Sequence, residues 1–187
     1  MSQINDLSNH FLIAMPNLMD PNFSHGVTYM CEHNEEGALG ILINQPLGLY
    51  LGDIFMQMGI NSTNQDVKEL PVLFGGPIHP DRGFIIHRPT GIWRSSLEIT
   101  PDITVTTSQD ILEAIAMGGG PNEFLIALGY AGWAHNQLEQ EMANNTWLSC
   151  TASNDILFKT PIHKRWEAAA ALIGIDINSL SSDIGHA

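Results

Sequence analysis

Apolar residues along the chain fall into short runs that glycine, proline and polar residues interrupt. Apolar runs of roughly four to eight residues between turn signals are typical of buried strands, and β-branched and aromatic residues favour the same assignment. The pattern therefore predicts strands over residues 11–15, 27–33, 38–44, 72–74, 83–87, 103–107, 124–128, 147–151 and 156–158.

Elsewhere the apolar residues recur three and four positions apart, which is the spacing of one helix face. Ser108 is a favourable N-cap for one such segment, and Gly118 is suited to end it. Residues 61–70 are polar and are expected to form a surface loop. The spacing predicts helices over residues 49–58, 109–117, 134–144 and 161–173.

The predicted strands and helices are interspersed without the strict alternation of a parallel sheet, so we expect a mixed sheet in an α+β or α/β fold. A length of 187 residues fits one compact domain over residues 1–187, and 44% hydrophobic residues supply its core. With 14% charged residues, the composition excludes a disordered chain, a coiled coil and a collagen-like fibre.

Neither end of the chain carries a targeting signal that we can identify. The first residues lack the basic and apolar regions of a signal peptide, and the apolar stretch 168–175 is far shorter than the ~20 residues that cross a bilayer. Cys31 and Cys150 are either two free thiols or one disulfide. We expect a cytoplasmic protein with no membrane association.

The chain is strongly acidic, with 20 acidic and 7 basic residues and a formal net charge of -13. Such a surface repels phosphate backbones. Three of the four predicted helices carry no basic residue, and only the last one carries Lys164 and Arg165. Because specific readers of DNA usually place basic side chains on a recognition helix, we expect no direct binding to nucleic acid.

Six of the basic residues fall in two short windows, which are Arg82, Arg88 and Arg94, and then Lys159, Lys164 and Arg165. If the windows meet in space, they form an anion-binding patch, to which the backbone amides of Gly75 and Gly76 could contribute. The alternative is that the basic side chains pair with local acids such as Asp81 and Glu167.

Phosphate-binding loops, dinucleotide fingerprints and the common hydrolase motifs do not occur in the sequence. An enzyme with an unrecognised site would have its best centre at His79, Arg82 and His87, with histidine as acid or base and arginine as anion clamp. Cys31 and His33 lie two apart on a predicted strand and would share one face, but no second ligand pair has zinc spacing. We therefore expect no metal and no cofactor.

The segment Gly129–Trp133 lies at a predicted strand-to-helix junction, a position that often lines a ligand crevice in α/β sheets. The alternative is that Tyr130 and Trp133 pack in the core. Together with the basic windows, this segment completes the candidate ligand-binding residues, which are Gly75, Gly76, Arg82, His87, Arg88 and Trp133.

Short phrases over nearly the entire chain resemble those of the bacterial AlgH/YqgE family. They occur in order with plausible gaps, which makes the resemblance more specific than any single motif. The phrases are Met15–Leu18, Asp20–Phe23, Glu32–His33, Gly37–Gly40, Asn44–Pro46, Gly75–Pro77, Arg82–Phe84, His87, Ile103–Ser108, Asp110, Gly129–Trp133, Gln137–Glu139, Trp147–Leu148 and Arg165–Trp166.

The resemblance implies an α+β fold: a single compact domain with a mixed, bifurcated β-sheet curled into a pseudo-barrel and helices packed outside. It supplies no established catalytic residues and no cofactor. One branch of the family is labelled a transcriptional regulator, and many members are uncharacterised. Gln45 departs from the family pattern, because many relatives are expected to carry arginine or lysine there.

Together these features predict a non-catalytic binding or regulatory module that acts through a protein or small-molecule partner. A transcriptional regulator, acting directly or indirectly, and an enzyme with a site near His79, Arg82 and His87 are the alternatives.

Overall fold

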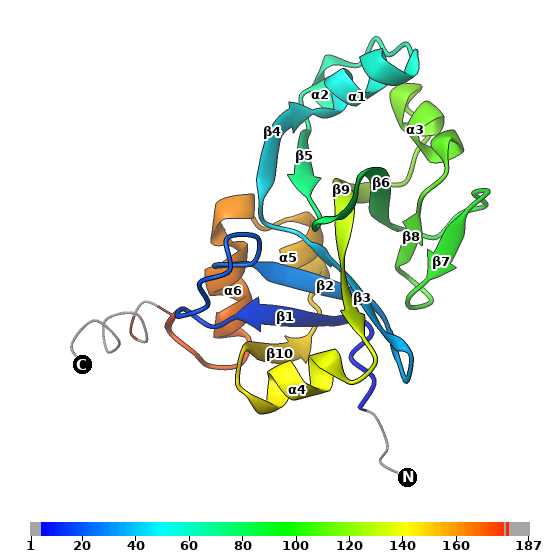
Figure 1. Cartoon of the computed structure of the whole chain (residues 1–187). Coiled ribbons are helices and arrows are strands. Elements are labelled where there is room, and N and C mark those ends of the chain that lie inside the picture. Colours follow the sequence, from blue (N-terminus) through cyan, green and yellow to red (C-terminus); the bar gives the residue numbers. More distant parts are fainter. Residues whose placement is uncertain (1–4, 178, 180–187) are drawn as a thin grey trace.

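The fold is organised around strand β9 (Glu123–Ala134), which runs through the middle of the molecule in Figure 1. The structure is a computed structural model, and it describes residues 5–177 and 179. The other strands are β1 (His10–Ala14), β2 (Val27–Asn34), β3 (Gly37–Leu42), β4 (Pro46–Tyr50), β5 (Pro71–Phe74), β6 (Ile78–Arg88), β7 (Ser96–Glu98), β8 (Thr104–Thr106) and β10 (Trp147–Thr151).

β9 is the point at which the sheet divides. Its last residues pair with β3, its residues 123–128 and Tyr130 pair with β6, and β5 joins it in parallel at Ala127 and Leu128. The strand order is β10-β1-β2-β3-β9-β6-β8-β7, with β4 paired to β5 at the branch. The sheet is thus mixed and bifurcated, and it curls into a half-barrel in a single α+β domain, as the resemblance implied.

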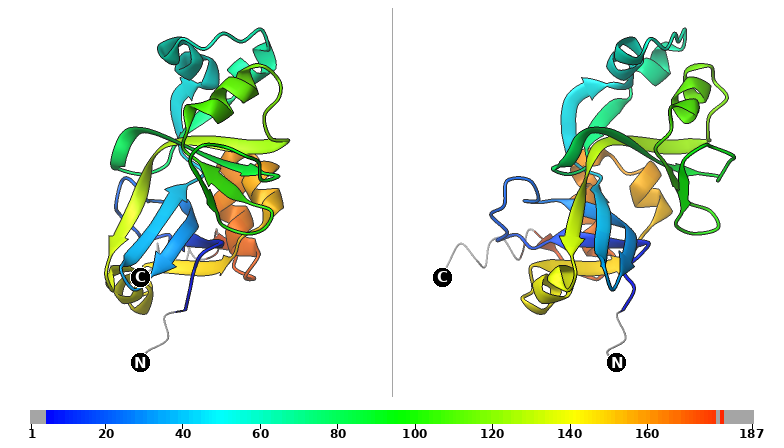
Figure 2. Two further views of the ribbon diagram at one scale, coloured as in Figure 1. Left: turned by 90° about the vertical axis from the view of Figure 1, so that its right-hand side faces the viewer. Right: turned by 45° about the vertical axis from the view of Figure 1, so that its right-hand side comes forward.

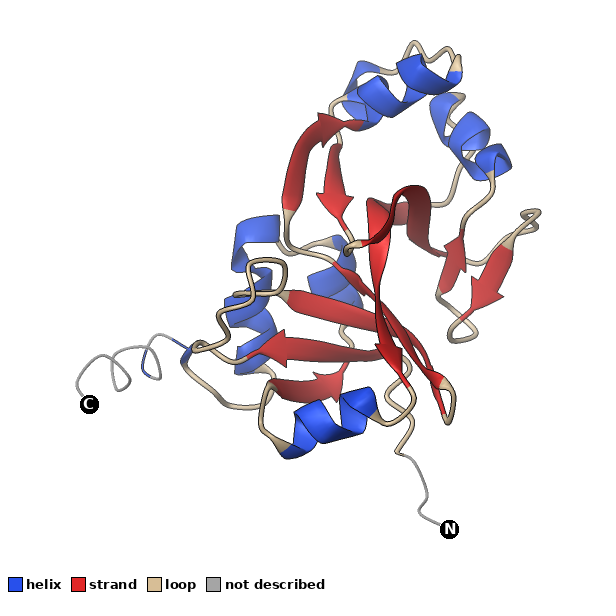
Figure 3. Ribbon diagram, viewed as in Figure 1, coloured by secondary structure: helices blue, strands red, loops and turns tan. Residues whose placement is uncertain are grey.

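The helices lie outside the sheet and form two groups (Figures 1 and 3). The first three lie at one end of the molecule, beside β4 and β5, and the others surround the opposite end (Figure 2). The helices are α1 (Leu51–Met58), α2 (Gln65–Lys68), α3 (Gln109–Ala116), α4 (Gln137–Ala143), α5 (Asn154–Phe158), the short 3₁₀ helix η1 (Ile162–Lys164) and α6 (Arg165–Ala171). None of the helices in the described part of the chain is long and apolar enough to cross a membrane.

The buried side chains form three clusters, which we name by the helices that cover them. The α5–α6 cluster fills the curl of the sheet, the α1–α3 cluster lies at the end with β4 and β5, and the α4 cluster lies on the other face of the sheet. β9 contributes to all three, with Ala127 in the first, Ile126 in the second and Trp133 in the third.

Gly129 reverses the side-chain alternation of β9, and this reversal decides which cluster each later residue of the strand joins. Before Gly129 the odd-numbered Ala127 faces the α5–α6 cluster, whereas after it the even-numbered Tyr130 packs there and Ala131 faces α4. The reversal needs the left-handed conformation of Gly129, with φ +79°. A Cβ at Gly129 would also overlap the carbonyl oxygen of Gly76.

The structure corrects several expectations about local structure. Residues 156–158 were expected to form a strand but lie in helix α5, because the Ser153 hydroxyl accepts the Ile156 N–H (3.3 Å) and caps a helical turn. Gly129–Trp133 lies inside β9 rather than at a strand-to-helix junction. The last helix is divided into η1 and α6 and ends at Ala171.

Three short elements were not expected from the sequence. β4 carries proline and glycine and is exposed at every position, so it lacks the pattern of a half-buried strand. β7 is an exposed three-residue edge strand, and α2 is a single turn in the segment expected to be loop, capped by Asn64. Their pairing and packing partners, rather than their own sequences, specify them.

Replacement of Gly129 by alanine is expected to destabilise the protein by roughly 2–4 kcal/mol, since the change combines a left-handed backbone strain with a backbone overlap. Urea unfolding monitored by circular dichroism measures the loss. Gly119→Ala is the matched control, because a Cβ there comes no closer than 3.8 Å to another atom; it should change stability by less than about 0.5 kcal/mol. Equal effects of the two substitutions would contradict the role of Gly129.

Candidate functional site

A pocket of about 720 Å³ lies between α1 and α3, above β6 and β9. Figure 1 shows these two helices facing each other across the end of the sheet. The volume falls within the range of roughly 300–1,000 Å³ that is usual for small-molecule sites. The lining residues are Ile54, Gln57, Met58, Asp81, Gly83, Ile85, Thr107, Gln109, Leu112, Ile126 and Leu128.

The floor of the pocket is apolar and comes from the paired strands. Ile85 of β6 lies opposite Ile126 of β9, and both are almost fully buried. Gly83 lies opposite Leu128, and the nearest atom to a Cβ built on Gly83 is 4.0 Å away. The missing side chain of Gly83 therefore leaves space that its neighbours do not fill.

The alternation of β6 decides which of its side chains reach the pocket. Asp81, Gly83 and Ile85 line it, whereas Phe84 and Ile86 point to the α5–α6 cluster. The sequence of β6 thus presents a carboxylate, an empty position and an aliphatic side chain in a row from the rim to the floor.

The walls of the pocket are the C-terminal half of α1 and the N-terminal half of α3. Ile54 and Leu112 present apolar surface, and both belong to the α1–α3 cluster. The rim is polar, with the amides of Gln57 and Gln109 and the hydroxyl of Thr107. An apolar interior with a few polar groups at the mouth is the usual character of a ligand pocket.

A second, more open groove of about 560 Å³ lies along β3 and β9. Tyr130, Gly132 and Trp133 line it together with Glu32 and Leu39. The expectation that this aromatic segment lines a crevice thus has a geometric basis, although the indole of Trp133 is largely buried in the α4 cluster. The groove is smaller and more open to solvent than the pocket between α1 and α3, so it would enclose less of a ligand.

Gly75 and Gly76 lie where the end of β5 crosses β9. A Cβ at Gly75 would overlap the Gly129 carbonyl oxygen, and one at Gly76 would overlap the backbone of Tyr130. The Gly75 N–H donates to the Leu128 carbonyl (2.8 Å), so that amide is not free for an anion. These glycines serve the close crossing of two backbones.

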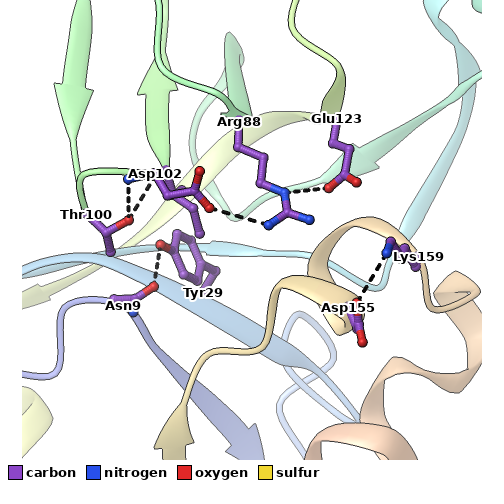
Figure 4. A network of polar contacts seen from close by, with 9 residues as sticks. Asn9, Tyr29, Arg88, Thr100, Asp102, Glu123, Asp155 and Lys159 are labelled. Carbon is purple, nitrogen blue, oxygen red and sulfur yellow. Dashed lines mark hydrogen bonds and ion pairs between the residues drawn. The ribbon is translucent and has the colours of Figure 1, made fainter.

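The two basic windows approach each other at Arg88 and Lys159, where acids neutralise both side chains (Figure 4). The Arg88 guanidinium donates to Glu123 (2.6 Å) and Asp102 (3.4 Å) and lies 5.6 Å from the centroid of the Phe158 ring. The Arg88 hydrogen bond lowers the pKa of Glu123, and Lys159 pairs with Asp155. These basic side chains therefore pair with acids of the chain, as the alternative to an anion patch predicted. The acids are Glu123, Asp102 and Asp155 rather than Asp81 and Glu167.

Two further basic residues point away from any shared patch. The Arg82 guanidinium lies over the Phe84 ring, 5.6 Å from its centroid, on the face of β6 opposite the α1–α3 pocket. Arg165 is buried and donates to the carbonyls of Thr160 and Ile43, and burial lowers its pKa to about 10. Gln45, which stands where many relatives are expected to carry a basic residue, contacts the loop before β2. Its side-chain N–H donates to the Asn22 carbonyl (2.9 Å).

The alternative catalytic centre is not assembled. His87 lies opposite Phe124 of β9, whereas His79 follows Ile78, which lies opposite Tyr130. Phe124 and Tyr130 are six positions apart on β9. At a rise of about 3.3 Å per residue, this spacing places the two histidines about 20 Å apart. Trp133 is nine positions along β9 from the partner of His87, so the candidate ligand residues do not form one site.

His87 is fully buried and has a structural environment. Its Nδ1 lies 3.0 Å from the Pro89 carbonyl and its Nε2 lies 2.7 Å from the Thr106 hydroxyl. Because a carbonyl only accepts, Nδ1 carries the proton and Nε2 accepts from Thr106. The Thr106 oxygen is then left to accept from Ser96 (2.9 Å), and burial lowers the pKa of His87.

Cys31 and His33 lie on opposite faces of the sheet, contrary to expectation. A β-bulge between Met30 and Glu32 adds one residue and shifts the alternation. Cys31 consequently enters the α5–α6 cluster, while the Nε2 of His33 pairs with Glu139 of α4 (2.7 Å). Both cysteines are free thiols, and the described residues contain no cluster of three or more side chains arranged to hold a metal.

The α1–α3 pocket cannot be recognised from the sequence, because four separate elements supply its lining. One signal was present. Gly83 begins the strand predicted over residues 83–87 and lies inside the longer strand β6 of the structure. Glycine inside a strand often marks a place where another group approaches closely.

Comparisons with known proteins agree on one family. A family model described as AlgH-like matches residues 11–178. A UPF0301 protein of Nitrosococcus oceani is 54% identical over 96% of both chains, and one of Legionella pneumophila is 51% identical over the full length of both. The solution structure of the AlgH protein from Pseudomonas aeruginosa is 44% identical, with a TM-score of 0.81 over 100% of this chain and 99% of that one.

A more distant neighbour supports the fold alone. The crystal structure of a protein from Corynebacterium diphtheriae has a TM-score of 0.74 at 16% identity, covering 97% of this chain and 94% of the other.

The buried neutral state of His87 is expected to make stability depend on pH. The unfolded histidine, with a pKa of about 6.5, binds a proton that the folded one resists, so stability falls as the pH drops below that value, by at most about 1.4 kcal/mol per pH unit. His87→Gln should lower stability near neutral pH by roughly 1–3 kcal/mol but flatten this dependence. Urea unfolding between about pH 7.5 and pH 5 measures both; parallel curves for the two proteins would contradict the assignment.

Proposed function

The chain belongs to the AlgH-like family, and we propose that it is a non-catalytic module that binds a small molecule in the pocket between α1 and α3. One observation carries the proposal, namely a pocket of about 720 Å³ with an apolar floor and a polar rim. The ligand would bury apolar surface against Ile85 and Ile126 and place a polar end among the side chains of the rim.

The polar groups of the pocket favour binding over catalysis. They are two amides, a hydroxyl and the carboxylate of Asp81, with no second titratable group beside it. General acid–base catalysis needs paired groups within reach of the reacting atoms. The two histidines considered for catalysis lie outside the pocket lining.

The position of the pocket between two helices supports the proposal of a regulatory role. A ligand that contacts both α1 and α3 stabilises the arrangement in which they face each other, and its concentration then controls that arrangement. We further propose that any regulatory effect on transcription is indirect and that the protein acts in the cytoplasm, to which its two free thiols are suited.

A protein-binding module is the second candidate, and strand β4 favours it. β4 pairs on one side only, with β5, and is exposed throughout. Leu47, Leu49 and Tyr50 present apolar surface there, and the strand carries no charge. Uncharged edge strands are open to pairing with another chain.

Gly83→Leu is expected to fill the pocket and weaken binding of a neutral apolar probe at least tenfold. N-phenyl-1-naphthylamine, titrated by its fluorescence, is a suitable probe. The space around Gly83 allows the new side chain without backbone overlap, so the variant should remain folded by circular dichroism. Gly119→Leu adds the same volume beyond the far end of α3 and should leave binding unchanged. Equal binding by all three proteins would count against the pocket.

Direct binding to duplex DNA is expected to be absent. Arg165 is buried, which leaves Lys164 as the exposed basic residue at the start of the last helix. In a gel-shift assay at about 1 μM protein and physiological salt, duplex DNA should show no shift, because such binding depends on clustered positive charge. A salt-dependent shift that is lost on replacement of Lys164 would overturn this expectation.

A further inference from the structure

The charges around the mouth of the α1–α3 pocket determine which polar end a ligand can carry. Asp81 is exposed at the rim, and among the described residues its carboxylate has no ion pair. The C-terminal end of α1, which carries Gln57 and Met58, also borders the pocket. Helix C-termini carry a partial negative charge, so both features favour a positive group.

The opposite wall does not reverse this preference. The N-terminal end of α3 borders the pocket and would attract an anion, but the carboxylate of Asp110 already occupies it. Asp110 accepts the backbone N–H of its own neighbour Ile111 (3.0 Å) and that of Arg94 (2.9 Å). The positive end of α3 is therefore matched by a carboxylate of the chain itself.

Basic side chains do not compensate for Asp81. No lysine or arginine is among the lining residues, although Arg82 is the next residue in the chain. The alternation of β6 turns the Arg82 guanidinium to the other face, over the Phe84 ring. Arg94 contacts Asp110 through its backbone N–H, but Arg94 is not among the residues that line the pocket.

We infer that the ligand of this pocket has an apolar body and a cationic end, as in an alkylammonium or arylammonium compound, with Asp81 as the residue that selects the charge. The inference rests on the proposed function. Phosphorylated and carboxylated ligands are disfavoured because they would meet Asp81 without a basic partner. The net charge of -13 adds a longer-ranged attraction for cations, which salt weakens.

Competition between ligands of one length and different charge tests this inference. N-phenyl-1-naphthylamine is bound first and then displaced with octylammonium, octanol or octanoate at neutral pH and low ionic strength. Octylammonium should displace the probe at about one tenth of the concentration that octanoate needs, which corresponds to about 1.4 kcal/mol. In Asp81→Asn the two concentrations should agree within about twofold, while displacement by octanol stays the same.

Glu167→Gln is the matched control, since it removes one negative charge from an exposed position on α6, at the other end of the molecule. It should retain the tenfold preference. If it reduces the preference as much as Asp81→Asn does, the net charge and not Asp81 is responsible, and the inference is wrong. Equal or better displacement by octanoate also overturns it while leaving the proposed function intact. A probe that does not bind the unaltered protein overturns both.

Discussion

Two backbones cross at Gly75–Gly76 and Gly129 so closely that neither has room for a side chain. This contact holds the end of β5 against the middle of β9, directly after the parallel pairing of the two strands ends at Phe74 and Leu128. On one side of the crossing β9 continues to β3, and on the other it pairs with β6. The branch therefore carries β4, β5 and α1 away from the half-barrel and places α1 opposite α3. The candidate pocket exists because of this arrangement.

The pocket is also a consequence of incomplete packing at that end. α1 and α3 bury their apolar faces on the sheet through residues such as Phe55 and Ile115. Between them, Gly83 supplies no side chain to fill the floor. Protein interiors are usually packed as densely as organic crystals, and an apolar space left open at the surface lowers the cost of receiving an apolar ligand.

The regular part of the fold could be predicted from the sequence. Apolar periodicity identified most strands and the helices α1, α3 and α4, and the family resemblance implied the bifurcated sheet. The rest depends on partners distant in the chain. Residues 156–158 form a helix because of the Ser153 cap and packing in the α5–α6 cluster, and the bulge at Cys31 appears only when β2 is aligned with β3. The pocket needed four elements in place, so no local pattern predicted its lining.

The same dependence explains why the glycine and arginine motifs suggested an anion site that the fold does not form. Glycines permit close approach, and here the approaching group is another strand. Arg88 and Arg165 are held by carboxylates and carbonyls of the chain, so their charges and donors are already used. What is left unmatched at the α1–α3 pocket is a carboxylate, that of Asp81. In an acidic protein whose basic groups are engaged internally, the unpaired charge beside a cavity is negative, and a ligand that complements it is positive.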